Sequence, residues 1–313
     1  MTLVKSDIPN LLTVGLQRDF QKSQQDAQVD AVYKTACTIV NSTKSSEKYG
    51  WLGAVPKMKK WVDERQAEGL LEHSLEIVNE SYEATISVDR DALEDEQYGQ
   101  IRLRVASLAE EGERFYDEKL AELIEANGTA YDGQNFFDTD HSSGSSGTYS
   151  NAPSAAAGYV TLTAANFATV GQLAITAMRR FKNDKGKPFG SNPSHVLVCP
   201  EDEFAALQAF DPSHINQMQT GASVQSMKGR FKVLVSDYLT AAGSIGKNKV
   251  YWLDLRHQIK PFILQIRKKL AFTALDKDDD YANFMRKEVY YGVDNRFGMG
   301  YGEHRYAYRT QGA

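Results

Sequence analysis

The chain has 313 residues, of which 42% are hydrophobic and 25% are charged, which allows one large or two medium globular domains with a sizeable core. No apolar run approaches the roughly 20 residues that cross a bilayer, and the first residues, "MTLVKSDIPNLL", lack the pattern of a signal peptide. The formal net charge of −5 excludes the basic footprint of a sequence-reading nucleic-acid binder.

The N-terminal part predicts one helix and then a strand. In "SDIPNLLTVGLQRDF", Leu12, Leu16 and Phe20 share one stripe, as in an amphipathic helix. The polar "QKSQQDAQ" that follows is typical of a linker. "KTACTIVNS" is rich in β-branched residues and predicts a strand, and the next residues, with glycines and a proline, predict a loop.

Residues 71–89 predict a long hairpin. In "SYEATISVD" apolar and polar residues alternate, which indicates a strand with one wet face. "LEHSLEIVNE" alternates in part, and Asn79 stands where a turn would join the two strands. An isolated hairpin is poorly stable, so we expect this one to lie against another surface.

A long helix is predicted over residues 91–127. Acidic residues fill its first turn, apolar residues keep helical spacing along it, and Asn127–Gly128 is a stop signal. The single apolar stripe without sustained charge pairing favours a helix along a sheet over half of a coiled coil.

The rest of the chain predicts an α/β region. A helix over 163–181 precedes a buried strand at "HVLVCP" and a short helix at "EDEFAALQAF". Three further strands and a C-terminal run of aromatic strands with glycine bends follow. The two cysteines, Cys37 and Cys199, are far apart and are expected to be buried and reduced.

The stretch "YDGQNFFDTDHSSGSSGTYSN" (131–151) is the strongest site candidate. Asp138, Asp140 and His141 are possible ligands of a divalent metal ion. One loop supplies at most three ligands, however, and the remaining histidines are scattered along the sequence. We therefore expect a structural loop, in which Asp132 and Asp138 bond local amides and the two phenylalanines anchor it. No motif for phosphate binding, nucleophilic catalysis or calcium binding is present, and no cofactor is expected.

These residues also carry a family resemblance. "YDGQNFFDTDH" strongly resembles the signature of the major head subunit of Mu-like bacteriophages and prophages, and "VNSTKSSEKYGWLG" resembles the same family's N-terminal segment. The order of "WVDERQ", the hairpin, "ISVDRDALEDE" and the long helix also agrees. In the C-terminal half, "NPSHVLVCP", "KPFILQIRK" and "DDDYANFMRKEVYYGVDNR" match in pattern. The resemblance covers about the whole chain, and its first half is the more specific.

The resemblance implies an α+β, Hong Kong 97-type capsid fold. The implied segments are an N-arm (1–44), an extended hairpin loop (45–90), a peripheral domain with a spine helix (91–160), an axial domain (161–255) and return strands to the peripheral domain (256–313). The implied structural loop contains Tyr131, Asp132, Gly133, Gln134, Phe136, Phe137, Asp138 and His141.

The implied function is that of a non-enzymatic subunit that self-assembles, as pentamers and hexamers, into the icosahedral head of a tailed double-stranded DNA phage. Assembly is expected in the bacterial cytoplasm, with a portal, a possible decoration protein and non-specific contact with the packaged DNA, and without a membrane. About 40 residues precede the extended hairpin loop that starts at residue 45, and they hold no sustained heptads. We therefore expect the N-arm to stay intact and scaffolding to come from a separate protein.

Two alternatives remain open from the sequence. One is an encapsulin-like compartment of the same fold, which a bound cargo enzyme would distinguish. The other is a metal-dependent hydrolase that uses Asp138, Asp140 and His141, which a metal assay would distinguish.

Overall fold

The computed structural model describes residues 8–50, 75–90, 98–153, 164–211, 227–239, 249–276 and 280–311. The helices are α1 (Ile8–Ala27), α2 (Val32–Ala36), α4 (Tyr98–Ala126), α5 (Ala164–Arg180), α6 (Pro200–Phe210) and α8 (Tyr281–Arg286), with a 3₁₀ turn η3 (His304–Tyr306). The strands are β1 (Cys37–Asn41), β2 (Ser46–Tyr49), β3 (Leu75–Val78), β4 (Glu80–Asp89), β5 (His195–Val198), β6 (Lys232–Val235), β7 (Lys249–Leu253), β8 (Phe262–Leu275), β9 (Glu288–Tyr301) and β10 (Ala307–Gln311).

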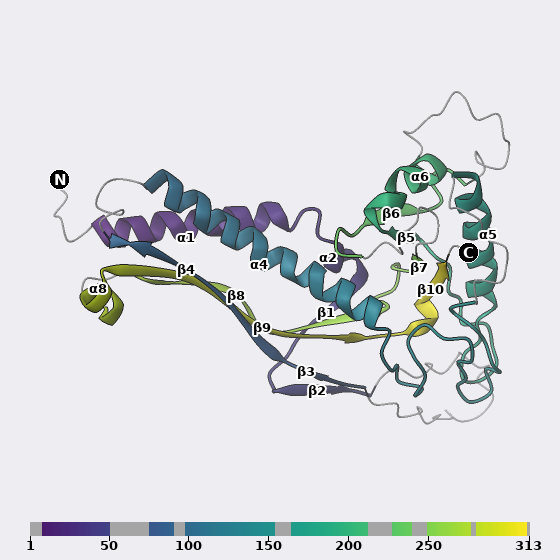
Figure 1. The fold of residues 1–313 in the computed structure, drawn as a ribbon. Coiled ribbons are helices and arrows are strands. Elements are labelled where there is room, and N and C mark those ends of the chain that lie inside the picture. The colour runs from purple at the N-terminus through teal and green to yellow at the C-terminus, as the bar shows by residue number, and fades with distance from the viewer. Residues whose placement is uncertain are drawn as a thin grey trace, which may run out of the picture.

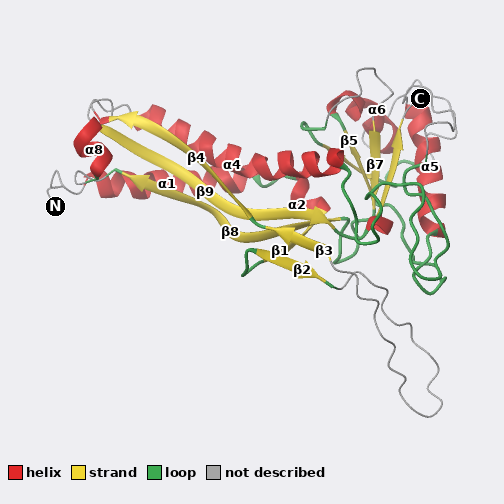
Figure 2. Cartoon of the chain, turned by 60° about the horizontal axis from the view of Figure 1, so that its bottom comes forward, coloured by secondary structure: helices red, strands yellow, loops and turns green. Residues whose placement is uncertain are grey.

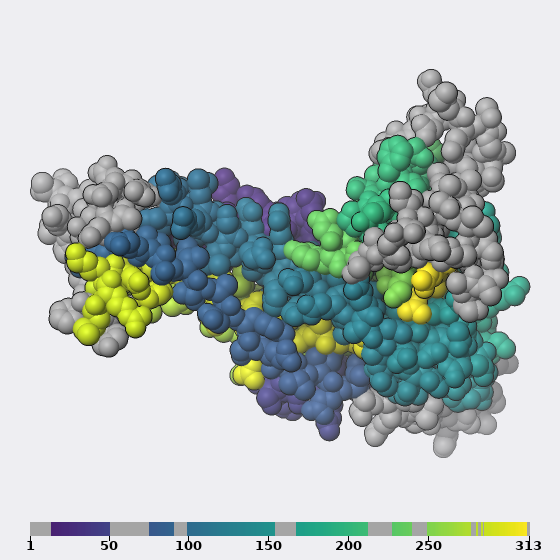
Figure 3. Space-filling view, viewed as in Figure 1, coloured from purple at the N-terminus to yellow at the C-terminus, as the bar shows by residue number. Residues whose placement is uncertain are grey.

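The described residues form an elongated body with a different sheet at each end (Figure 1). A long sheet with α1 and α4 beside it makes one end, and a second sheet with α5 and α6 makes the other. The space-filling view shows the two ends as one continuous body (Figure 3). None of the helices among these residues has the length and apolar character needed to cross a membrane.

The long sheet has the strand order β1-β8-β9-β4. β8 and β9 pair antiparallel, β1 runs parallel to β8, and β4 runs antiparallel to β9. Along β9, Val289, Tyr291 and Val293 alternate with more exposed residues, and they pack in one core with residues of α1 and α4. The predicted position of the long helix along a sheet is therefore confirmed, and Figure 2 shows both helices beside the strands.

The second sheet has the order β10-β7-β5-β6. One of its faces packs against α5 and α6 in an aromatic core that includes Phe210, Phe231 and the fully buried Trp252. The opposite face contributes Leu197, Tyr251 and other residues to a core that also holds residues of β8 and β9. The two sheets thus share one apolar core, because β5 and β7 alternate their side chains between two packed faces.

A small two-stranded sheet, β2-β3, projects from the long sheet. It approaches β9 closely where β9 carries Gly298 and Gly300. A Cβ atom on Gly298 would overlap the carbonyl oxygen of Val78 in β3, so only glycine permits this close approach of the two backbones. Asn79 fixes the base of the sheet, because its Nδ2 donates to the Ser42 Oγ and the Lys44 carbonyl.

Several sequence predictions need correction. β3 pairs with β2 and β4 pairs with β9, so the predicted hairpin of residues 71–89 is wrong, and Asn79 links two sheets. The predicted linker after Phe20 is helical to Ala27, and α1 packs on α4 of the same chain. A short helix, α8, opens the predicted C-terminal strands. Residues 51–74 of the expected extended loop lie outside the described residues.

The last strand also crosses the expected segment boundary. β10 pairs with β7, so the end of segment 256–313 lies in the sheet built from residues 195–253. Antiparallel pairing with β7 satisfies backbone N–H and C=O groups of β10 and makes it an edge strand of the second sheet. Cys37 and Cys199 are both buried and unbridged, as predicted.

Candidate functional site

The loop 131–151 begins where α4 ends. Asn127 has φ 46°, a left-handed conformation that asparagine tolerates and that stops the helix. Its Nδ2 donates to the Phe137 carbonyl at 3.1 Å, and its Oδ1 accepts from the Phe137 amide at 2.8 Å. The predicted helix stop is confirmed, and one side chain ties the helix end to the loop.

The first residues of the loop make a tight turn. Gly133 has φ 85°, where a side chain would be strained, and the Ala130 amide donates to the Gln134 carbonyl at 2.7 Å. Asp132 Oδ1 accepts from the Gln134 amide at 3.3 Å. The prediction that Asp132 bonds a local amide is therefore confirmed.

Phe136 and Phe137 join the two sheets. Both are buried. Phe136 packs against Phe262 of β8 and Tyr301 of β9, with ring centroids 5.3 and 4.9 Å apart. Phe137 packs against Tyr251 of β7 at 5.3 Å. Two consecutive side chains thus enter the shared core from different sides, and their predicted anchoring role is confirmed.

Behind these rings lies a buried polar cluster. His141 Nδ1 is 2.7 Å from Asp132 Oδ2, and His141 Nε2 is 3.2 Å from Asn151 Oδ1. The orientation of the Asn151 amide is fixed, because its Nδ2 donates to the carbonyls of Phe136 and His304. His141 is therefore hydrogen-bonded through both ring nitrogens.

His304 joins this cluster from the other end of the chain. Its ring stacks on His141 with centroids 4.2 Å apart and planes 11° apart. His304 Nε2 is 2.6 Å from the Tyr149 hydroxyl and 3.7 Å from Asp132 Oδ2. Asp132, His141 and His304 thus bring three possible metal ligands within 4.8 Å of one another.

The ring geometry disfavours coordination by this trio. An imidazole binds a metal ion through a lone pair that lies in the plane of the ring. Since the rings of His141 and His304 are stacked and nearly parallel, one ion cannot lie in both planes. The cluster is built for hydrogen bonding, and the absence of a metal cofactor stays a prediction.

A second buried group holds the start of the loop. The Tyr131 hydroxyl donates to Glu303 Oε1 at 2.9 Å and accepts from Arg305 Nη2 at 2.6 Å. Arg305 Nε and Glu303 Oε1 form an ion pair at 3.0 Å. Burial raises the pKa of Glu303, and the positive charge of Arg305 opposes that rise. Residues 303–305, just before β10, therefore clamp the loop.

Asp138 and Asp140 lie outside the Asp132–His141–His304 group of possible ligands. Asp138 Oδ1 accepts from the Thr139 amide at 2.7 Å, the main reason for its lowered pKa and the local role predicted for it. Asp140 is exposed. The metal ligand set considered from sequence is therefore not the one that the fold brings together.

Sequence reasoning missed five residues of the site: Tyr149, Asn151, Glu303, His304 and Arg305. His304 was interpreted as one of several scattered histidines, and the residues around it as glycine bends in a strand. "GEHR" at 302–305 has no periodicity or spacing that marks a site. Only its position against residues 131–151 shows its role.

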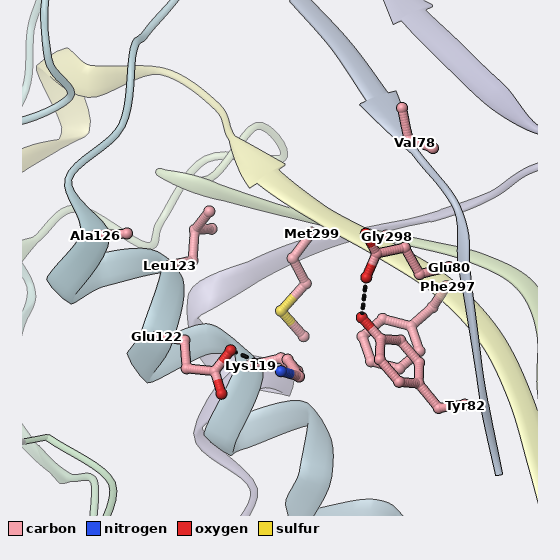
Figure 4. Close-up of a pocket in the computed structure, with 10 residues that line it drawn as sticks. All are labelled: Val78, Glu80, Tyr82, Lys119, Glu122, Leu123, Ala126, Phe297, Gly298 and Met299. Carbon is pink, nitrogen blue, oxygen red and sulfur yellow. Dashed lines mark hydrogen bonds and ion pairs between the residues drawn. The ribbon is translucent and has the colours of Figure 1, made fainter.

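The surface has a groove of about 300 Å³ between α4 and the strands β4 and β9 (Figure 4). Tyr82, Phe297 and Met299 give it an apolar floor. The Tyr82 hydroxyl donates to Glu80 Oε2 at 2.6 Å, and Lys119 Nζ pairs with Glu122 at 2.7 Å. The charged side chains that line the groove therefore have partners, and they form no nucleophile–base arrangement.

The fold is that of phage capsid proteins of the Hong Kong 97 type. The chain is similar to a subunit of the procapsid of bacteriophage JBD30, with 25% identity and a TM-score of 0.58 over 97% of this chain and 76% of that one. It is also similar in fold to a chain of Mycobacterium phage Ogopogo, with 13% identity and a TM-score of 0.52 over 91% and 92% of the two chains.

The family follows from the sequence. The model of the Mu-like prophage major head subunit gpT matches residues 10–167, 154–239 and 240–313, and the chain belongs to this family. It is 27% identical to the major capsid protein of Escherichia phage Mu over 314 residues, which are 100% of this chain and 76% of that protein. It is 26% identical to the major head subunit of the Haemophilus influenzae prophage FluMu, again over 100% of this chain and 76% of that protein. The chain is a structural head subunit.

Proposed function

We propose that copies of this chain assemble, as pentamers and hexamers, into a closed icosahedral shell that encloses the double-stranded DNA of a tailed phage. The match of the whole chain to the gpT family, together with the fold shared with a procapsid subunit, carries this proposal. Many modest contacts between identical subunits add up in a closed ring or shell.

The proposed segments follow the strand pairing. The long sheet with α4 is the peripheral domain and its spine helix, and the second sheet with α5 and α6 is the axial domain. The extended loop is proposed to end at Val78 instead of at residue 90, because β4 belongs to the long sheet. Residues up to 44 are the N-arm, although α1 already packs on α4 within the subunit.

The loop 131–151 is proposed to act as a joint, which here means that it holds the two sheets in a fixed relation. Phe136 contacts the long sheet and Phe137 contacts the second sheet. Residues 303–305 lock the loop from the side of β10. A subunit whose two sheets keep a fixed relation presents the same surfaces to each neighbour, which shell curvature requires. This role needs neither catalysis nor a cofactor.

We further propose a separate scaffolding protein, a portal and a decoration protein as partners, and assembly in the host cytoplasm. The test is expression of the full chain alone and with a scaffolding protein of the same phage. Size-exclusion chromatography and negative-stain microscopy should show monomers, tubes or mis-sized shells alone, and uniform shells with the partner. Persistently monomeric protein in both samples would contradict the proposal.

A further inference from the structure

Basic side chains converge at one end of the second sheet. β5 and β6 are parallel and pair His195 with Lys232, while the last residue of β7, Leu253, also pairs with His195. Segments around residues 192–195, 230–232 and 254–260 therefore meet at the same sheet end. The sequence alone does not predict this group of basic side chains, because the three segments are distant in the chain and the net charge is −5.

A buried carboxylate fixes two of the arginines there. The side chain of Asp254 is fully buried. It accepts from Arg256 Nε and Nη2, each at 2.8 Å, and from the Asn192 amide at 2.8 Å. Asn192 Oδ1 in turn accepts from Arg230 Nη2. Asp254 and Asn192 thus hold Arg256 and Arg230 side by side, while the Arg256 side chain stays 48% exposed.

The positive charges act on one another. Burial lowers the pKa of Arg230, and the charges of Arg179 and Arg256 lower it further. Burial also lowers the pKa of His195, and Lys232 and Lys260 lower it further. Asp254 is a negative charge that opposes both effects. Hereafter, the basic cluster means Arg179, Arg230, Lys232, Arg256 and Lys260.

We propose that the basic cluster is a contact site for the backbone phosphates of double-stranded DNA. Guanidinium N–H groups donate charge-assisted hydrogen bonds to phosphate oxygens. The bonds from Arg256 Nε and Nη2 to Asp254 hold that side chain in place, so less conformational freedom is lost when a phosphate binds. DNA carries one phosphate charge per ~1.7 Å of its axis, so one duplex segment can neutralise several of these cations together. The site rests on the proposed function, because it assigns the enclosed DNA a place on the subunit.

The experiment measures binding of a fluorescein-labelled 30-base-pair duplex to the full chain by anisotropy over a range of salt concentrations. The test variant is Arg179→Gln with Lys232→Gln, two exposed side chains. The matched control is Arg102→Gln with Lys268→Gln, whose exposed cations pair with Asp19 and Asp294 on the other part of the molecule.

Each lost phosphate contact lowers the slope of log K against log salt by about 0.9. We expect the magnitude of this slope to be about 2 smaller in the double test variant than in the wild type, and to be unchanged in the control. No measurable binding by the wild type, an unchanged slope in the double variant, or an equal loss in the control would overturn the proposal. The double variant should still form shells. If it binds DNA normally but forms none, the cluster is a contact between subunits, which overturns this site and leaves the proposed function standing.

Discussion

Replacing Phe136 by alanine should strongly destabilise the subunit. The Phe136 side chain is fully buried and contacts the rings of Phe137, Phe262 and Tyr301. Truncation of a buried phenylalanine to alanine lowers the free energy of unfolding by about 3–5 kcal/mol, because the loss of buried apolar surface and the cavity left behind both destabilise the folded state. The total free energy of unfolding of a domain is about 5–15 kcal/mol, so this loss is a large fraction of the total.

The assay is urea unfolding of the soluble subunit, followed by far-ultraviolet circular dichroism and by tryptophan fluorescence, to which the buried Trp252 of the second sheet contributes. Because Phe136 lies in the core that both sheets share, the midpoints from both signals should fall. The matched control is Phe204→Ala on α6, where the ring is 65% exposed. An exposed substitution should change stability by less than about 0.5 kcal/mol.

Two results would refute the joint between the sheets. One is a loss below about 1 kcal/mol for Phe136→Ala, or a loss equal to that of the Phe204 control. The other is a shifted circular dichroism midpoint with an unchanged fluorescence midpoint, since the second sheet would then be independent of the loop.

Four further outcomes are expected. Burial raises the pKa of Asp117 to about 6, against an ordinary 3.8. Because the folded state holds this proton more tightly than the unfolded chain, the stability of the wild type should rise relative to that of Asp117→Asn as the pH falls from 7 to 4. Urea unfolding at several pH values measures this difference. Gly298→Ala should cost about 1–3 kcal/mol by the same assay, because its Cβ would overlap a carbonyl oxygen of β3. Replacing residues 51–74 by a two-residue turn should leave a folded subunit that forms no shells in the microscope. Cys37 and Cys199, whose thiol pKa values burial raises, should resist a thiol reagent until the chain is unfolded; fast labelling of native protein would contradict this.

The sequence by itself determined the local features of this chain. The stop of α4 at Asn127 is local, because it depends on the backbone conformation of one residue. The helical stripe that contains Ile101 and Val105 also predicted which face is buried, and both residues are in the core. The anchoring of the loop by Phe136 and Phe137 followed from apolar side chains in a turn-rich segment.

Only the tertiary structure decided which segments meet. β3 and β4 adjoin in sequence and both alternate, yet they pair with β2 and β9, because register and partner are set by long-range packing. His304 reaches His141 across more than half of the chain for the same reason. A pattern of period two or 3.6 says which side of an element is buried, but it does not say which element covers that side.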